Sequence, residues 1–215
     1  RYYVGEWWVQ DFSAMLPIYL TKNLNKKKII DLCAAPGGKS FQLLSQTNNL
    51  TIMEKNSKRA KILNENLVRL NYNKNIIIDD SMNIDEDLKY DLILIDAPCS
   101  SIGTIRKNPE ILFRKKINEI DYYLNIQDQL LQKAAKLTKK NSEIIYMVCS
   151  FFEKETKKQI ENFLNKNQNF SIEKFSSKKY NQLIDEYGYI NTIPNKLVEN
   201  VKIDGFFAAK VKRND

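Results

Sequence analysis

The chain has 215 residues, of which 43% are hydrophobic and 28% are charged, and a formal net charge of +8. Such a length and composition are typical of one globular domain, and no apolar run in the sequence reaches the length of a membrane-spanning helix. The chain contains no histidine, which excludes a Ser-His-Asp triad, a Cys-His dyad and any metal site that needs a histidine ligand.

Short apolar runs alternate along the chain with stretches of helical periodicity. Five runs predict buried strands: KIIDLCA (28–34), LTIME (50–54), NIIID (75–79), YDLILIDA (90–97) and EIIYMVCS (143–150). Between them we predict a helix from about Lys39 to Ser45 and three more with apolar stripes at Ala60, Leu63, Leu67 and Leu70, at Ile117, Ile120, Leu124, Leu131 and Ala135, and at Ile160, Phe163 and Leu164. This alternation predicts a doubly wound α/β domain with a mostly parallel sheet covered on both faces.

The two ends of the chain are less regular. FSIEKF (170–175) and GFFAAKVKR (205–213) predict two final strands. Residues 176–203 give no clear pattern beyond the turns marked by Gly188 and Pro194. The chain does not begin with Met, from which we expect a piece of a longer protein.

Reactive side chains gather where predicted strands end. At or just past these ends stand Cys33, Cys99, Cys149, Glu54, Asp80 and Asp96. Because ligands of such sheets bind at the carboxyl ends of the strands, we expect these groups to line one site. The three cysteines are few and contain no CxxC pair, which indicates a reducing compartment, such as the cytoplasm, and no zinc or other metal.

The string DLCAAPGGKS (31–40) places two of the chain's six glycines between a strand and a helix. Glycines at such a junction let backbone N–H groups approach a ligand closely. The spacing matches neither GxGxxG nor a P-loop, and a tight turn without a ligand is the alternative for two glycines alone. Glu54 stands where nucleotide-binding α/β folds place the carboxylate that accepts the ribose hydroxyls, and Asp80 could contact the adenine end of a cofactor.

A second string, DAPCSSIGTIRKNPE (96–110), holds a carboxylate and a thiol in one rigid turn after the fourth strand. MVCS (147–150) offers another thiol at the end of the fifth strand. A lone cysteine at such a place is usually a small buried hydrophobic residue. Two thiols at neighbouring strand ends indicate chemistry instead, because a thiolate is a strong nucleophile.

These strings, in this order, resemble the Sun (RsmB-type) family of RNA 5-methylcytosine methyltransferases. The matching blocks cover nearly the whole chain: G-x-x-x-VQD (5–11), DLCAAPGGK, DAPCS-x-x-G-x-x-R-x-x-P, x-CS followed by the acidic Glu153 and Glu155, and DGFF (204–207). The resemblance implies a Rossmann-like class I methyltransferase fold. It also implies that residues 1–215 form a catalytic domain, without the N-terminal RNA-binding helical domain of bacterial members of the rRNA type.

The resemblance further implies an S-adenosylmethionine site lined by Cys33, Ala34, Ala35, Pro36, Gly37, Gly38 and Lys39. Glu54 would hold the ribose, Asp80 the adenine side, and Asp96 the methionine end or the target base. Three positions depart from the family's usual pattern: Glu54 replaces Asp, Val148 replaces the Thr before the catalytic cysteine, and Asp79-Asp80-Ser81 replaces a Gly-Asp-Gly turn. None of these departures removes a reacting group.

The chemistry of cytosine methylation gives the two later cysteines different parts. A thiolate that adds to carbon 6 turns the ring into an enamine, whose carbon 5 can attack a sulfonium methyl group before the carbon 5 proton is lost and the enzyme is released. DNA cytosine methyltransferases use a Pro-Cys cysteine, here Cys99, whereas the RNA enzymes that the chain resembles use the cysteine of the later strand, here Cys149. We therefore predict that Cys149 is the nucleophile, that Cys99 assists release and that Asp96 bonds cytosine N3, while the role of Lys39 stays open.

The resemblance and, more weakly, the basic charge imply an RNA substrate, with ribosomal RNA as the first candidate and transfer RNA as the second. We expect the protein to be a cytoplasmic monomer that does not bind a membrane. An amino-group methyltransferase would have an Asn/Asp-Pro-Pro-aromatic turn where this chain has Asp96-Ala97-Pro98-Cys99. A module that binds S-adenosylmethionine and RNA for assembly, without turnover, would not need both Cys99 and Cys149. A purely structural α/β domain is the last alternative.

Overall fold

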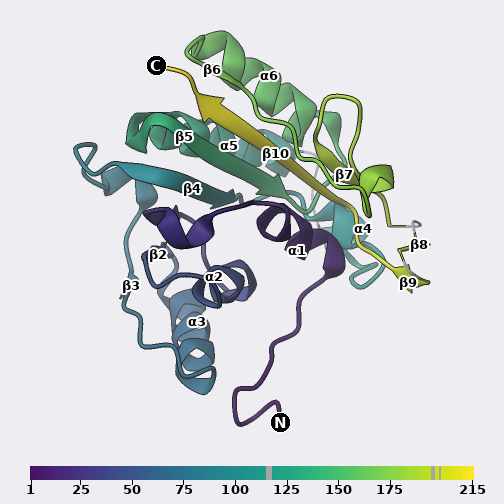
Figure 1. Ribbon diagram of the computed structural model, residues 1–215. Coiled ribbons are helices and arrows are strands. Elements are labelled where there is room, and N and C mark those ends of the chain that lie inside the picture. The colour runs from purple at the N-terminus through teal and green to yellow at the C-terminus, as the bar shows by residue number, and fades with distance from the viewer. Residues whose placement is uncertain (115–117, 195–196, 199) are drawn as a thin grey trace.

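The computed structural model describes residues 1–114, 118–194, 197–198 and 200–215 and has a central sheet between layers of helices (Figure 1). The strands of this sheet are β1 (Ile29–Asp31), β2 (Leu50–Met53), β3 (Ile76–Ile77), β4 (Tyr90–Asp96), β5 (Thr138–Val148), β6 (Phe170–Ile172), β7 (Ile190–Thr192) and β10 (Phe206–Arg213). They lie in the order β3-β2-β1-β4-β5-β10-β6, with β7 beside β10. The α/β class predicted from the sequence is confirmed.

The first five strands form the parallel part of the sheet. β1 pairs in parallel with β2 and β4, β2 with β3, and β4 with β5. The last strand, β10, runs antiparallel between β5 and β6, so its amino end lies at the edge where the parallel strands end. The sheet is therefore mostly parallel, as predicted, and the chain returns to its ligand-binding edge just before β10.

The helices cover the sheet in two layers. α1 (Phe12–Tyr19), α2 (Gly38–Leu44) and α3 (Ser57–Arg69) lie on one face, and α5 (Asn118–Leu137) and α6 (Lys157–Lys166) on the other, with the single turn α4 (Ile111–Arg114) before α5 (Figure 1). The sequence did not predict α1, which is short and contains Pro17, a residue that lacks the N–H of a helical hydrogen bond. Within the described part of the chain, no helix is long and apolar enough to cross a membrane.

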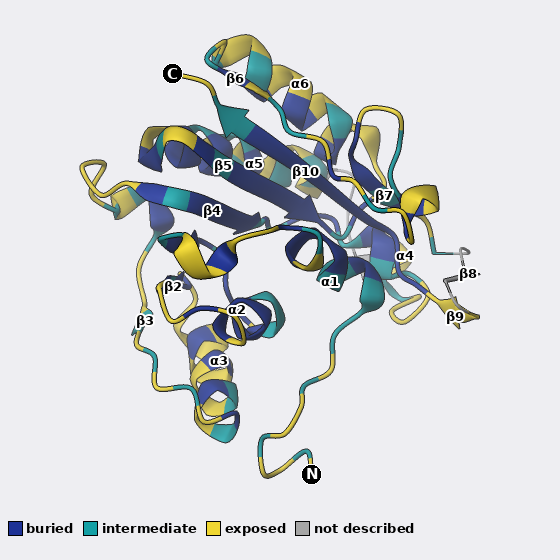
Figure 2. Cartoon of the chain, in the orientation of Figure 1, coloured by how far each residue is buried: buried dark blue, intermediate teal, exposed yellow. Residues whose placement is uncertain are grey.

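Alternate residues of the strands face opposite layers. Leu92 and Leu94 pack with α1, α2 and α3, whereas Ile93 and Ile95 pack with α5 and α6. Because both faces of the sheet are covered, its central strands are buried along most of their length, which explains why they read as continuous apolar runs (Figure 2).

The helical stripes are confirmed in large part. Buried members of the predicted stripes are Ala60, Leu63, Leu67, Leu70, Leu131, Ala135, Ile160 and Phe163. Ile120, Leu124 and Leu164 are half-buried, and Ile117 lies outside the described residues. The turn predicted at Gly188 is also confirmed, because its φ of +88° is a conformation that favours glycine.

The stretch that the sequence left unassigned contributes to the sheet. Strand β7 extends the edge beside β10, and β8 (Leu197–Val198) pairs with β9 (Val201–Lys202) as a separate hairpin. These strands are two or three residues long, which is too short for a periodic pattern to show.

Candidate active site

The turn from β1 to α2 is built around a buried carboxylate, Asp31. Its two oxygens accept hydrogen bonds from the Ser40 hydroxyl at 2.6 Å and from the backbone N–H of Cys33 at 3.3 Å. β1 ends at Asp31 and not at residue 34 as predicted, although the N–H groups of Leu32 and Ala34 still donate to the carbonyls of Leu94 and Met53 on the neighbouring strands. Gly37 has a φ of +117°, and a Cβ there would lie 2.1 Å from the Phe41 ring, so only glycine fits.

Burial gives Asp31 a testable effect on stability. Burial is the main cause that raises its pKa from 3.8 to about 6, so ionisation of Asp31 is harder in the folded than in the unfolded chain. The contribution of this group to stability is therefore greatest below pH 4 and falls by about 3 kcal/mol as the pH rises through 6. Between pH 4 and pH 7, we therefore expect the free energy of unfolding of Asp31→Asn to rise by about 3 kcal/mol relative to that of the wild type.

Urea unfolding of both proteins at several pH values measures this gain. The exposed Asp87 offers a matched control, because Asp87→Asn changes the same group in solvent. A stability difference between Asp31→Asn and the wild type that stays flat from pH 4 to pH 7 would contradict the prediction.

Glu54 ties this turn to the end of β2. Its side chain is buried, and its carboxylate accepts hydrogen bonds from the backbone N–H groups of Ala35 at 3.1 Å and Asn56 at 2.9 Å. Arg59 lies 3.7 Å from the same carboxylate and donates a hydrogen bond to the carbonyl of Ala35. The two strand ends are therefore held together by charged and backbone groups.

A cavity of about 670 Å³ opens beside Glu54. Its lining comprises Leu32, Cys33, Glu54, Lys55, Asn56, Arg59, Asp80, Ser81, Met82, Pro98, Tyr122, Tyr123, Ile126, Gln129 and Leu130. Three predicted site residues, Cys33, Glu54 and Asp80, are among them. On the rim, a hydrogen bond from Lys55 lowers the pKa of Asp80.

The other residues predicted for this site lie around the cavity or beyond it. Ala34, Ala35, Pro36, Gly37 and Gly38 form the turn behind Cys33 and do not line the cavity. The sequence reasoning missed the wall that α5 contributes, because aromatic residues near the start of an amphipathic helix give no signal of a ligand.

Lys39, whose role the sequence left open, points to the neighbouring strand end. Its Nζ lies 2.7 Å from Oδ2 of Asp96 and 5.3 Å from the centre of the Phe206 ring. Burial by itself lowers the pKa of Lys39, but the charge of Asp96 and the hydrogen bond to it outweigh burial and raise this pKa. A cation thus lies at the end of β4, on the side where the thiols are found.

The two thiols predicted to act together are in contact. The sulfur atoms of Cys99 and Cys149 lie 3.4 Å apart, within hydrogen-bonding distance. This hydrogen bond and burial raise the pKa of Cys99, which is only 5% exposed. The same bond lowers the pKa of Cys149, which is more exposed and also feels the charge of Lys39. The pKa of Cys149 is therefore shifted below that of Cys99, although either sulfur atom can donate the hydrogen bond between them.

The backbone of Cys149 is fixed by two glycines. The N–H of Gly103 donates to the carbonyl of Cys149 at 3.0 Å, and the N–H of Gly205 donates to the carbonyl of Gly103 at 2.8 Å. A Cβ on Gly103 would lie 2.0 Å from the Gly205 oxygen and 3.0 Å from the Cys149 carbonyl carbon. The three segments can approach this closely only because two of them carry glycine.

Gly103→Ala is therefore expected to destabilise the protein by roughly 1–3 kcal/mol, because the backbone must move to admit the methyl group. Gly38→Ala is a matched control, since the nearest atom to a Cβ there lies 3.5 Å away. Urea unfolding compares the two variants with the wild type. Equal stabilities of the two variants would contradict the prediction, because they would show that the segments of Gly103, Cys149 and Gly205 can move apart without loss of stability.

A cluster of four charged residues joins the segments of Gly103 and Gly205 to the N-terminal part of the chain. Arg106 lies 2.8 Å from Asp204, and Lys107 lies 2.7 Å from Asp11 and 2.8 Å from Asp204. Burial opposes ionisation of Asp11, but hydrogen bonds from Lys107 and Ser13 lower its pKa to about 2. The cluster joins three blocks far apart in the sequence, whose contact the sequence alone did not reveal.

Comparison with known proteins places this arrangement in a family. Residues 18–212 match the model of the 16S rRNA methyltransferase RsmB/F family. The chain is 34% identical over 169 residues to ribosomal RNA small subunit methyltransferase B of Photorhabdus laumondii and 32% identical over 215 residues to that of Pasteurella multocida. These matches cover 76% and 95% of this chain but only 39% and 46% of the relatives, so the chain spans less than half of their length.

The fold has a solved counterpart. The crystal structure of NSun6 from Pyrococcus horikoshii with SFG superposes with a TM-score of 0.85 at 22% identity, covering 99% of this chain and 54% of the other. That identity supports the likeness of fold alone. By the extent of its match to the family model, the chain belongs to the 16S rRNA methyltransferase RsmB/F family.

Proposed function

We propose that this protein is an S-adenosylmethionine-dependent RNA methyltransferase that modifies carbon 5 of cytosine, with Cys149 as the nucleophile. The observation that carries the proposal is the contact between Cys149 and Cys99, 3.4 Å apart at the edge of the sheet where Lys39 and Asp96 also lie. Two thiols that share one proton suit a reaction in which one sulfur atom adds to a ring and must later be expelled.

The cavity beside Glu54 fits the proposed cofactor. Its volume of about 670 Å³ is in the range of small-molecule sites, and its walls combine apolar side chains with a carboxylate. We assign the ribose to Glu54, the adenine side to Asp80 and the apolar wall of Met82 and Ile126, and the methionine end to Cys33 and Asp96. S-adenosylmethionine, when bound, supplies an electrophilic methyl group.

In this proposal the residues of the chain activate the cytosine in two steps. The thiolate of Cys149 adds to carbon 6, and the electron pair of the ring moves so that N3 takes up a proton from solvent and carbon 5 becomes the nucleophilic carbon of an enamine. Asp96 holds the proton at N3, and Lys39 keeps Asp96 in place while its charge favours the thiolate of Cys149.

The residues of the chain then release the product. Once Cys149 is bonded to carbon 6, it no longer holds the proton of Cys99, so Cys99 can lose that proton to water and accept the one from carbon 5. Once carbon 5 carries the methyl group and has lost its proton to Cys99, the carbon–sulfur bond breaks and its electron pair returns to Cys149 as a thiolate. N3 returns its proton to solvent, and the ring regains its aromatic form.

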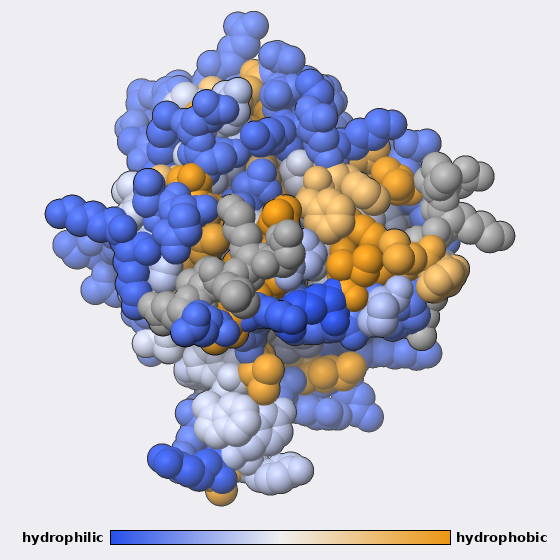
Figure 3. Space-filling model, turned by 90° about the vertical axis from the view of Figure 1, so that its right-hand side faces the viewer, coloured by the Kyte–Doolittle hydropathy of each residue, from blue (hydrophilic) through white to orange (hydrophobic). Residues whose placement is uncertain are grey.

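We propose RNA as the partner, ribosomal RNA first and transfer RNA second. The net charge of +8 supports a polyanionic partner. Phe151 and Phe152 directly follow the Cys149-Ser150 turn and are 37% and 36% exposed. Apolar side chains also gather on the face that Figure 3 shows, which is the right-hand side of Figure 1. Exposed aromatic rings beside a reactive group suit unstacked bases. We further propose that residues 1–215 form the catalytic domain of a cytoplasmic, monomeric enzyme.

Analysis of the product tests the proposal. The chain is incubated with methyl-labelled S-adenosylmethionine and either small-subunit ribosomal RNA or transfer RNA, and the digested nucleosides are separated by mass spectrometry. We expect label in 5-methylcytidine. Label in an N-methylated nucleoside would indicate an amino-group methyltransferase, and cofactor binding without label in either RNA would favour the assembly module.

A further inference from the structure

Glu155 lies behind the two thiols and is wholly buried, at 0% exposure. Its carboxylate accepts hydrogen bonds from the backbone N–H of Ser100 at 2.7 Å, the hydroxyl of Ser150 at 2.6 Å and the side-chain amide of Gln127 at 3.2 Å. The hydroxyl of Ser100 also donates to it. Ser100 follows Cys99 and Ser150 follows Cys149, so one carboxylate bridges the turns that carry both thiols.

The donors around Glu155 are all neutral. Both carboxylate oxygens act as acceptors. A buried carboxyl group is costly, and an apolar residue of similar volume would often serve stability as well. A wholly buried carboxyl group next to the proposed active site therefore indicates a role beyond packing.

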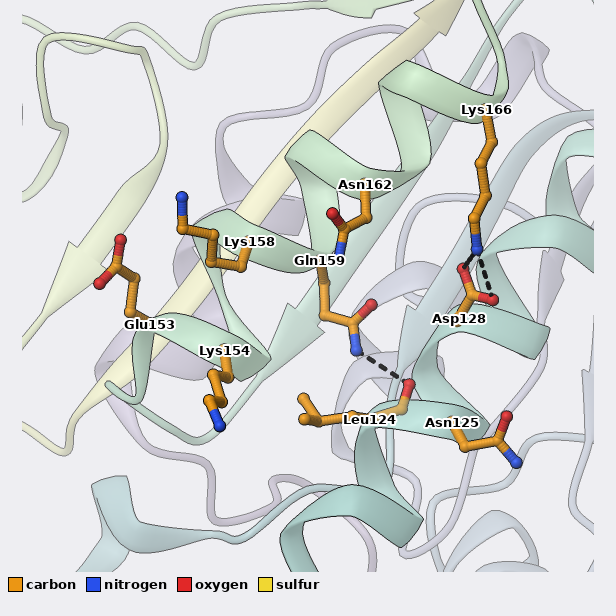
Figure 4. Close-up of a pocket in the computed structure, with 9 residues that line it drawn as sticks. All are labelled: Leu124, Asn125, Asp128, Glu153, Lys154, Lys158, Gln159, Asn162 and Lys166. Atoms are coloured by element: carbon orange, nitrogen blue, oxygen red, sulfur yellow. Dashed lines mark hydrogen bonds and ion pairs between the residues drawn. The ribbon is translucent and has the colours of Figure 1, made fainter.

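The network extends outward and makes the position of Glu155 rigid. Gln159 of α6 donates to the carbonyl of Leu124 on α5 at 2.9 Å, as Figure 4 shows, and to the side-chain oxygen of Gln127 at 3.3 Å. The hydroxyl of Tyr146 on β5 donates to the backbone carbonyl of Glu155 at 2.7 Å. Glu155 is thus anchored to both helices of this layer and to the strand that leads to Cys149.

We propose that Glu155 is a positioning residue that holds Cys99 and Cys149 in contact and keeps the shared proton on Cys99. This inference rests on the proposed function, in which Cys149 must be the thiolate. Besides the hydrogen bond with Cys149 and burial, the charge of Glu155 contributes to the raised pKa of Cys99. Loss of the carboxylate would therefore release the turns that carry Cys99 and Cys149 and remove one of the charges that raise the pKa of Cys99.

The test compares the reactivity of the two thiols as a function of pH. Wild type, Glu155→Gln and Glu153→Gln are alkylated with iodoacetamide between pH 5 and pH 10, and each cysteine is quantified by peptide mass spectrometry. Glu153 is a matched control, because it lies on the same short turn but is exposed and extends away from Gln159 and Leu124 (Figure 4). Cys33, on another strand end, reports any general loosening of the fold.

We expect wild type and Glu153→Gln to react first at Cys149. In Glu155→Gln the ratio of Cys149 to Cys99 labelling should fall by about tenfold or more, with the midpoint of Cys149 labelling about one pH unit higher, which corresponds to a tenfold loss of thiolate. An unchanged ratio and midpoint in folded Glu155→Gln would overturn the inference, as would an equal change in Glu153→Gln.

If Glu155→Gln does not fold, the same alkylation measurement on Ser150→Ala tests the inference. This variant removes one hydrogen bond of Glu155 and leaves its carboxylate in place. A lower labelling ratio supports the inference, and an unchanged ratio overturns it. Since no RNA is used, failure of this inference is separate from failure of the proposed function, which the methylated nucleoside decides.

Discussion

Replacing Cys149 by alanine is expected to abolish methylation, by on the order of 10⁴-fold or more, because no other group can form the bond to carbon 6. Covalent capture of RNA should be lost as well. The measurement uses RNA that contains 5-fluorocytosine, in which fluorine replaces the proton that must leave, so the adduct persists through denaturing electrophoresis. Peptide mass spectrometry then identifies the cysteine that is attached to RNA.

Replacing Cys99 by alanine should have the opposite effect on the adduct. Addition at carbon 6 needs only Cys149, whereas release needs a group that accepts the carbon 5 proton, so the complex with ordinary RNA should accumulate. An adduct on Cys99, kept in Cys149→Ala, would reverse the two roles. If a longer chain that includes the remainder of its relatives' length also fails to capture RNA, the covalent mechanism is wrong.

The second large effect is expected for Asp96→Asn, which should slow methyl transfer by roughly 10²- to 10⁴-fold. The amide cannot hold a proton at N3 as a carboxylate does, and the buried ammonium group of Lys39 loses the partner that lies 2.7 Å away. Single-turnover rates at saturating RNA and S-adenosylmethionine separate this loss from weaker binding.

Asp91→Asn is the matched control for this prediction. Asp91 lies at the opposite end of β4 and pairs with Lys139 at 2.8 Å, much as Asp96 pairs with Lys39. We expect its rate to stay near that of the wild type. A rate for Asp96→Asn equal to that of Asp91→Asn would remove Asp96 from the mechanism and leave it as an ion-pair partner only.

The sequence predicted the layers of the fold because strands buried on both faces appear as continuous apolar runs, and helices packed against them appear as apolar stripes. The centre of β4 and the carboxyl half of β5 contain almost only apolar residues, and α3 repeats its buried residues at helical spacing. Strand ends were less accurate: β1 ends at Asp31, three residues earlier than predicted, where a tight turn begins, and β5 begins at Thr138, five residues earlier than predicted. The residue at which a strand begins or ends depends on contacts between particular atoms, and the periodicity of the sequence does not encode these contacts.

The candidate site was predictable where chemistry restricts the residue type. The apolar runs predict where the strands end, and Cys99, Cys149 and Glu54 stand at or just past those ends. The role of Glu155 was not predictable, because the sequence shows it only as one of two nearby glutamates, and its distinction from Glu153 is burial. The partners of Lys39 and Arg106 likewise come from distant segments that only the folded chain brings together.

The position of β10 has a consequence for how the protein is made. Asp204, which pairs with Arg106, stands 193 positions after Asp11, and β10 must enter between β5 and β6 before Gly205 can reach Gly103. A chain that grows from its amino end carries both thiols long before it carries these residues. If the proposed function holds, we expect reactivity toward RNA to arise only once β10 has entered the sheet, because until then the two cysteines lack the contacts that Asp204 and Gly205 supply.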